Sequence, residues 1–106
     1  MEIFCALWLM AKGYRLLGFR VRTPLGEIDI LAKRGDVLAV IEVKQRRTLE
    51  QALTAISWKQ KQRLLRAGAS VAAKSTQLSG LAIRLDLMAL APGRWPRHIR
   101  DAWRDE

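Results

Sequence analysis

Acidic side chains at a spacing that could bind a metal ion occur in two short runs, residues 26–32 (GEIDILA) and 40–44 (VIEVK). Both runs alternate with a period of two, which is typical of half-buried β-strands, and residues 33–36 (KRGD) would form a hairpin turn. One antiparallel register opposes Glu27 to Glu42, and another opposes Asp29 to Glu42 and Glu27 to Lys44. Both place these four side chains on one face, whereas a shift by one residue without a bulge would send Glu42 and Lys44 to the other.

Three carboxylates on one face need a physical reason. Two unit charges about 4 Å apart repel by roughly 4 kcal/mol at an effective dielectric constant of 20. A chain tolerates this where the face is solvated, where one carboxyl group stays protonated, or where a cation lies between the groups. Mg²⁺ takes oxygen ligands, commonly one or two carboxylates with water and phosphate. An ammonium such as that of Lys44 can orient a water or stabilise charge on a phosphate. The alternative is an ordinary hairpin with a solvated polar face.

The composition favours a polyanionic partner. The 106 residues include 19 Lys and Arg against 10 Asp and Glu, a formal charge of +9. Such a balance attracts nucleic acid, because phosphate neutralisation releases counterions. A soluble basic protein without such a partner is the alternative. Nucleic acid would be attracted by the arginines, while the acidic cluster would need a metal to face its phosphates.

The chain length fits one domain spanning residues 1–106. The single cysteine, Cys5, excludes an intrachain disulfide and fits a reducing compartment, so we expect a cytoplasmic location. Residues 3–10 are apolar, but this run is too short for a bilayer and is bounded by Glu2 and Lys12. We therefore expect no membrane partner and no signal peptide.

The elements that must position the acidic residues follow from periodicity and capping signals. We predict helices over residues 2–12, 49–56 and 58–74, and strands over 14–22, the two acidic runs, 81–90 and an edge strand within 94–103. Residues 48–51 and 57–60 have the pattern of capping boxes. On the first helix, the expected apolar stripe is Ile3, Ala6, Leu7, Met10 and Ala11; on the last, it is Trp58, Leu65, Ala69 and Ala72. The order predicts an α/β fold, a mixed sheet flanked by helices.

Basic side chains follow the acidic hairpin. Arg46 and Arg47 continue the third strand, and Lys59, Arg63 and Arg66 share one face of the last predicted helix. These residues are candidates for phosphate contacts, although ordinary solvation of a charged helix face explains the helical group equally well. Arg84 and Asp86 either pair with each other, which we expect, or line the site. His98 is expected to be a surface or packing residue. Paired Cys and His spacing is absent, which disfavours zinc.

Residues 26–29 (GEID) followed by 42–44 (EVK) resemble the PD-(D/E)XK nuclease signature. The whole chain resembles the YraN family of small bacterial proteins, which are distantly similar to archaeal Holliday junction resolvases. The resemblance also covers residues 12–14 (KGY), the basic helix and residues 84–87 (RLDL). It implies a restriction-endonuclease-like domain with an α-β-β-β-α-β core.

Carried over by position, the resemblance implies a catalytic site. Asp29 and Glu42 would bind Mg²⁺ or Mn²⁺, Lys44 would position water or steady the phosphate, and Glu27 would be an accessory acid. Glu2 resembles a first-helix acid that completes some of these metal sites, and Gln60 resembles a polar helix position near them, expected to help bind nucleic acid. Isoleucine, rather than proline, precedes Asp29.

The leading hypothesis is a metal-dependent endonuclease acting on DNA rather than RNA, with branched or structured DNA as the implied substrate. The alternatives are a non-catalytic nucleic-acid-binding module with the same fold and a protein–protein adaptor. Because junction resolvases act as dimers on a two-fold substrate, the resemblance also implies a homodimer, formed through an exposed edge strand or the tail from Trp95 to Trp103.

Overall fold

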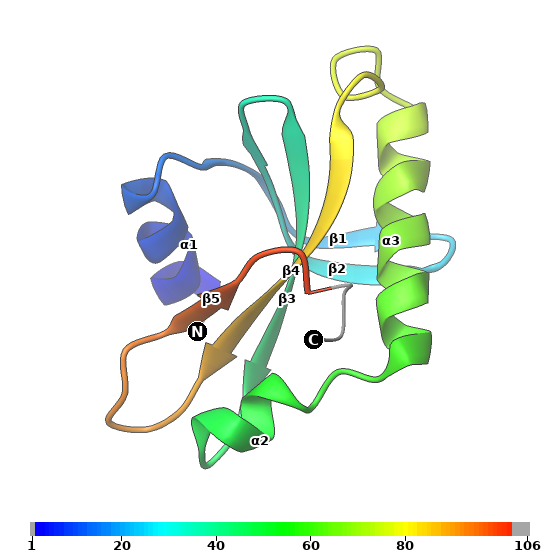
Figure 1. Ribbon diagram of the computed structural model, residues 1–106. Coiled ribbons are helices and arrows are strands. Elements are labelled where there is room, and N and C mark those ends of the chain that lie inside the picture. Colours follow the sequence, from blue (N-terminus) through cyan, green and yellow to red (C-terminus); the bar gives the residue numbers. More distant parts are fainter. Residues whose placement is uncertain (1, 103–106) are drawn as a thin grey trace.

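The structure, a computed structural model, describes residues 2–102, except for the side chain of Glu2 (Figure 1). The elements in chain order are α1 (Glu2–Ala11), β1 (Arg15–Thr23), β2 (Gly26–Arg34), β3 (Val37–Gln45), α2 (Leu49–Leu53), α3 (Trp58–Ala73), β4 (Ala82–Leu90) and β5 (Arg97–Ile99). One mixed sheet has the order β1-β2-β3-β4-β5. Only the β3–β4 pair is parallel among the described strands, and α2 and α3 lie in the connection between them. The predicted α/β fold with helices flanking a mixed sheet is confirmed.

The sheet separates two apolar layers. On one face, α3 covers a core that includes Val40, Leu64 and Leu85. On the other face, α1 covers a core that includes Leu9 and Ile41. Figure 1 shows α1 and α3 on opposite sides of the sheet. Because residues alternate along β3, Glu42 and Lys44 share the α3 face with Val40.

The β2–β3 ladder has one of the two predicted odd registers, with Ile30 opposite Ile41 and Arg34 opposite Val37. Continued by one residue, this register aligns Asp29 with Glu42. The ladder ends at Ile30, however, and the strand bends there. Ile28 packs in the α3-side core, whereas Ile30 packs in the α1-side core. The period of two predicted for residues 26–32 would place both isoleucines on one face, so it does not hold across Asp29.

The bend in β2 coincides with a distortion in β1. The β1–β2 pairs Phe19–Ile30 and Val21–Ile28 flank Arg20, which has a φ of 49°. A positive φ is uncommon for a residue with a side chain and interrupts regular strand geometry. Arg20 thus lies across from Asp29, and both strands leave the regular ladder at the same level.

Helix caps agree with the sequence patterns, whereas the buried faces of two helices do not. Thr48 accepts a hydrogen bond from the Gln51 amide and Ser57 from the Gln60 amide, so both caps are confirmed.

The buried face of α1 is formed by Cys5, Ala6 and Leu9, while Ile3, Leu7 and Met10 are exposed. The buried face of α3 contains Leu64, Ala67 and Ala72, while Trp58 is half exposed. Of the predicted stripes, Ala6 and Ala72 are buried as expected, but the large apolar residues show that both stripes were rotated from the buried faces. Within the described part of the chain, no helix is long and apolar enough to cross a membrane.

Candidate active site

Asp29 lies at the bend of β2. Its carboxylate takes the place of the β2 backbone carbonyl that would accept a hydrogen bond from β3 in a regular ladder. Asp29 Oδ2 accepts a hydrogen bond of 2.8 Å from the backbone amide of Val43 on β3. A buried or partly buried amide needs an acceptor, and past Ile30 the β2 backbone no longer supplies one through the regular ladder. The side chain of Asp29 therefore crosses to β3 and lies beside the residues around Val43.

Glu42 is the centre of the cluster. It is 6% exposed, and its Oε2 accepts a 2.8 Å hydrogen bond from Gln60 Nε2 on α3. The same oxygen lies 3.0 Å from the ammonium nitrogen of Lys44. Two adjacent strands and one helix thus bring together four of the predicted site residues, with Asp29 as the fourth.

The electrostatics of Glu42 reflect its burial and its acidic neighbour. Burial raises the pKa of Glu42, the Lys44 ammonium opposes this, and the charge of Asp29 together with a hydrogen bond to it raises the pKa further, for a net increase. Two carboxyl groups this close share either a proton or a cation. The structure therefore supplies the condition under which a divalent cation would stabilise the site.

The donor set fits a hard divalent cation with two protein carboxylates. Asp29 accepts through Oδ2 and Glu42 through Oε2 in the contacts above, and the two carboxyl groups also share a hydrogen bond, which a cation between them would replace. Among the side chains that the structure describes, which exclude that of Glu2, no three His, Cys, Asp or Glu residues lie close enough to form a larger metal cluster. Mg²⁺ is commonly held by one or two carboxylates, with water and substrate phosphate completing its shell, so two are sufficient.

Of the two other predicted acids, Glu27 does not join the pair. Glu27 is exposed and is partnered with Arg22 across the β1–β2 ladder, beyond the end of the β2–β3 ladder. It therefore does not face Lys44. An unbent β2 in the observed β2–β3 register would have placed Glu27 opposite Lys44. The side chain of Glu2, the third predicted metal ligand, lies outside the described residues.

The predicted basic residues form two groups. Lys59, Arg63 and Arg66 line a hollow of about 280 Å³ on α3, together with Leu25 from the β1–β2 turn. Arg46 and Arg47 follow β3 and are exposed beyond Lys44. Gln60 belongs to neither group, because its side-chain amide binds Glu42. The capping pattern of residues 57–60 suggested that the Gln60 side chain serves the start of the helix. The family resemblance instead placed Gln60 near the predicted catalytic site, which is where the structure has it.

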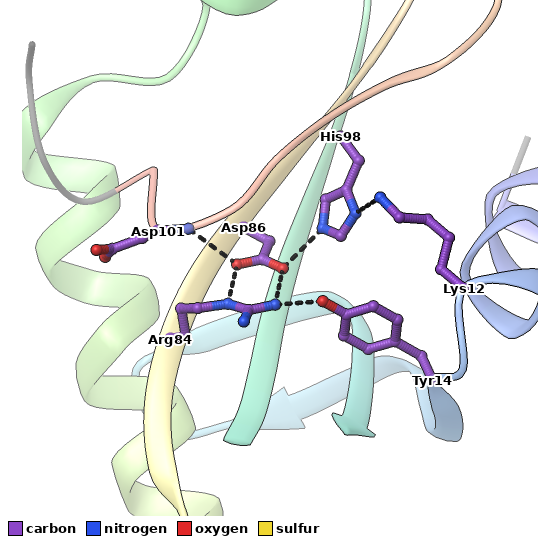
Figure 2. A network of polar contacts seen from close by, with 6 residues as sticks. All are labelled: Lys12, Tyr14, Arg84, Asp86, His98 and Asp101. Atoms are coloured by element: carbon purple, nitrogen blue, oxygen red, sulfur yellow. Dashed lines mark hydrogen bonds and ion pairs between the residues drawn. The ribbon is translucent and has the colours of Figure 1, made fainter. Parts of the chain in front are cut away.

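The opposite face of the sheet carries a second polar network, shown in Figure 2. Asp86 is fully buried and accepts hydrogen bonds from Arg84 Nε and Nη2, each 2.7 Å long, which confirms the predicted pair. His98 Nε2 lies 2.7 Å from Asp86 Oδ2, and the Arg84 guanidinium also contacts the Tyr14 hydroxyl. Burial opposes ionisation of Asp86, but the bonds from His98 and Arg84 outweigh it and lower its pKa.

Comparison with known proteins identifies relatives without an assigned activity. The model of the uncharacterised protein family UPF0102 matches residues 1–90. A UPF0102 protein of Caulobacter vibrioides is 63% identical over 102 residues, covering 96% of this chain and 82% of the relative. UPF0102 proteins of Maricaulis maris and Paramagnetospirillum magneticum are 50% and 43% identical, covering 96% and 97% of this chain and 80% and 83% of the relatives.

Proposed function

The chain belongs to the uncharacterised protein family UPF0102, as its resemblance to the YraN family implied, and we propose that it is a divalent-metal-dependent endonuclease acting on DNA. The observation that carries the proposal is the convergence of Asp29, Glu42 and Lys44 at the bend of β2. A partly buried pair of carboxyl groups beside an ammonium, in a protein of charge +9, matches the needs of phosphodiester hydrolysis.

Each side chain has a role that its contacts support. Asp29 and Glu42 would hold Mg²⁺ or Mn²⁺, which when bound supplies Lewis-acid stabilisation of charge on the phosphate. Lys44 lies 3.0 Å from Glu42 and would donate hydrogen bonds to the attacking water or the phosphate. Gln60 fixes the orientation of Glu42 from α3. Glu27 is an accessory acid in this proposal only if it approaches when substrate binds.

The basic hollow supplies the substrate contact. Lys59, Arg63 and Arg66 lie on the helix that also carries Gln60, so phosphates bound along α3 lead towards Glu42. Arg46 and Arg47 extend the basic surface beyond Lys44. Contacts of this kind recognise the backbone and not the sequence, which suits a nuclease selecting DNA by shape.

The test is cleavage of plasmid and four-way-junction DNA with Mg²⁺ or Mn²⁺. Asp29→Asn, Glu42→Gln and Lys44→Met should each abolish cleavage while leaving DNA binding in chelator intact. Asp36→Asn, which changes an exposed acid in the β2–β3 turn, is the matched control and should cleave normally. Cleavage that survives Asp29→Asn and Glu42→Gln together would refute the assignment.

A non-catalytic DNA-binding module is the second candidate, favoured by the presence of two rather than three clustered acids among the described residues. Salt-sensitive binding that is unchanged by chelator, without cleavage under either metal, would support it. We also propose, with the resemblance as support, a cytoplasmic location and a homodimer. Sedimentation at several protein concentrations tests the dimer, and a strictly monomeric protein would exclude it.

A further inference from the structure

Lys12, at the end of α1, is connected to a buried acid through a histidine (Figure 2). Lys12 Nζ lies 2.7 Å from His98 Nδ1, and His98 Nε2 lies 2.7 Å from Asp86 Oδ2. The His98 side chain is 1% exposed, whereas Lys12 is exposed to solvent. An ammonium only donates, so Nδ1 accepts from Lys12 and Nε2 carries the proton that His98 donates to Asp86. In this order of amine, imidazole and carboxylate, the imidazole can accept a proton from the amine, and the carboxylate stabilises the imidazolium that forms.

The groups around Lys12 are predominantly cationic. Arg34 from β2 lies over the Tyr14 ring, with 5.8 Å between the guanidinium carbon and the ring centroid, and Arg84 from β4 lies at the same distance from that ring. Arg100, after β5, also acts on the Lys12 charge.

Among the described residues, Asp86 is the one acid that acts on this amine. Partial burial and repulsion from Arg100, Arg84 and Arg34 lower the pKa of Lys12, against the attraction of Asp86. Asp101 turns its backbone amide, not its carboxylate, to Asp86. At neutral pH, a larger fraction of Lys12 is therefore in the free amine form than for an ordinary surface lysine.

We propose that Lys12 is a nucleophilic lysine that is acylated by small anionic acyl donors of the acyl phosphate class, with His98 receiving the proton that the amine releases. This site lies on the α1 side of the sheet, away from Glu42, and does not depend on the proposed nuclease activity. The same cations that favour the free amine attract the phosphate of the donor.

The reaction balances without a further reactant. The neutral amine of Lys12 forms a bond to the carbonyl carbon, and the bond from that carbon to the phosphate oxygen breaks. The proton lost by the amine passes to His98 Nδ1 while Asp86 holds the imidazolium through Nε2. His98 then returns this proton to the departing phosphate. The products are an amide on Lys12 and inorganic phosphate.

The test is competitive acetylation of the folded protein by acetyl phosphate, with each lysine followed by peptide mass spectrometry between pH 6 and pH 11. Lys59 and Lys74 are exposed lysines in the same molecule and serve as internal references. Lys12 should react several-fold faster than both at pH 7, and its rate should level off at a lower pH. Equal or slower reaction of Lys12 at pH 7 would overturn the proposal.

Variants separate nucleophilicity from attraction of the donor. His98→Gln keeps a donor for Asp86 but removes the basic nitrogen, so the advantage of Lys12 should disappear. Arg100→Gln changes an exposed residue and should move the pH midpoint of Lys12 upwards, which keeps the proposal testable if His98→Gln fails to fold. An uncharged active ester should also prefer Lys12, but to a smaller degree, because the arginines do not attract it. A preference restricted to acetyl phosphate, or an unmoved midpoint in Arg100→Gln, would refute the role of the amine.

Discussion

Replacing Asp86 with asparagine should strongly destabilise the protein. Asp86 accepts four hydrogen bonds: two from Arg84, one from His98 and one of 3.2 Å from the Asp101 backbone amide. Asparagine retains one acceptor oxygen, and its amide group faces donors in place of the other. Two charge-assisted bonds are lost, each worth about 1.5–3 kcal/mol, and Arg84 keeps a charge without its partner. We expect a loss of about 3–5 kcal/mol in the free energy of unfolding, as for other broken buried pairs.

The assay is urea unfolding, monitored by circular dichroism and tryptophan fluorescence. The dependence of the unfolding free energy on urea concentration should be the same for the variant and the wild type. The pH dependence has a definite sign. Because the pKa of Asp86 is lowered in the folded state, its contribution to stability is present above the ordinary aspartate pKa of 3.8 and is lost as pH falls through the folded value. The difference between wild type and Asp86→Asn should therefore be largest at pH 7 and shrink in acid.

Asp36→Asn is the control for this measurement, because its side chain is exposed and the change should remain within about 0.5 kcal/mol. A loss below about 1 kcal/mol for Asp86→Asn at pH 7 would show that the network does not carry the stability assigned to it. A difference independent of pH would show that the charge of Asp86 is not its source.

Three further changes test the packing and the candidate metal site. Gly68→Ala would place a Cβ 2.4 Å from a methyl group of Val40 and should lower the free energy of unfolding by about 1–3 kcal/mol in urea titration, whereas Gly80→Ala, with no atom within 4 Å, should change it little. The raised pKa of Glu42 means that its contribution to stability is lost as pH rises from 4.5 through the folded value, so Glu42→Gln should unfold at an equal or higher temperature than wild type at pH 8 without metal. Lower thermal stability of this variant would contradict that assignment. Mg²⁺ should raise the unfolding temperature of wild type but not of Asp29→Asn, and the increase should fade as pH falls and Glu42 is protonated; equal increases in both proteins would count against the site.

The acidic site was predictable because a period of two leaves few choices. Once β2 and β3 were recognised as a hairpin, either odd register placed Asp29 and Glu42 on one face. The ladder has one of these registers but ends at Ile30, so Asp29 reaches the neighbourhood of Glu42 through its own side chain rather than through strand pairing. Their position on the α3 side followed from the long helix after β3. The sequence could not show that Gln60 Nε2 binds Glu42 Oε2, because this contact depends on how deeply α3 packs on the sheet.

The faces of α1 and α3 were not predictable in the same way. Nine of the ten residues of α1 are apolar, so a three- and four-residue spacing fits several faces and does not choose among them. In α3, the buried face includes Lys61 and Gly68, which a search for large apolar residues misses. Gly68 is needed there because the helix approaches Val40 too closely for a larger residue.

The bend of β2 links the local backbone to the chemistry of the site. If β2 had continued its ladder past Ile30, a backbone carbonyl would have satisfied the Val43 amide, and Asp29 would have stood beside Glu42 as an unpaired acid. The bend instead lets the Asp29 carboxylate accept a hydrogen bond from the Val43 amide and lie beside Glu42, whose pKa the charge of Asp29 raises. A cation that bound between the two carboxyl groups would oppose this increase, so its binding would be coupled to deprotonation of Glu42.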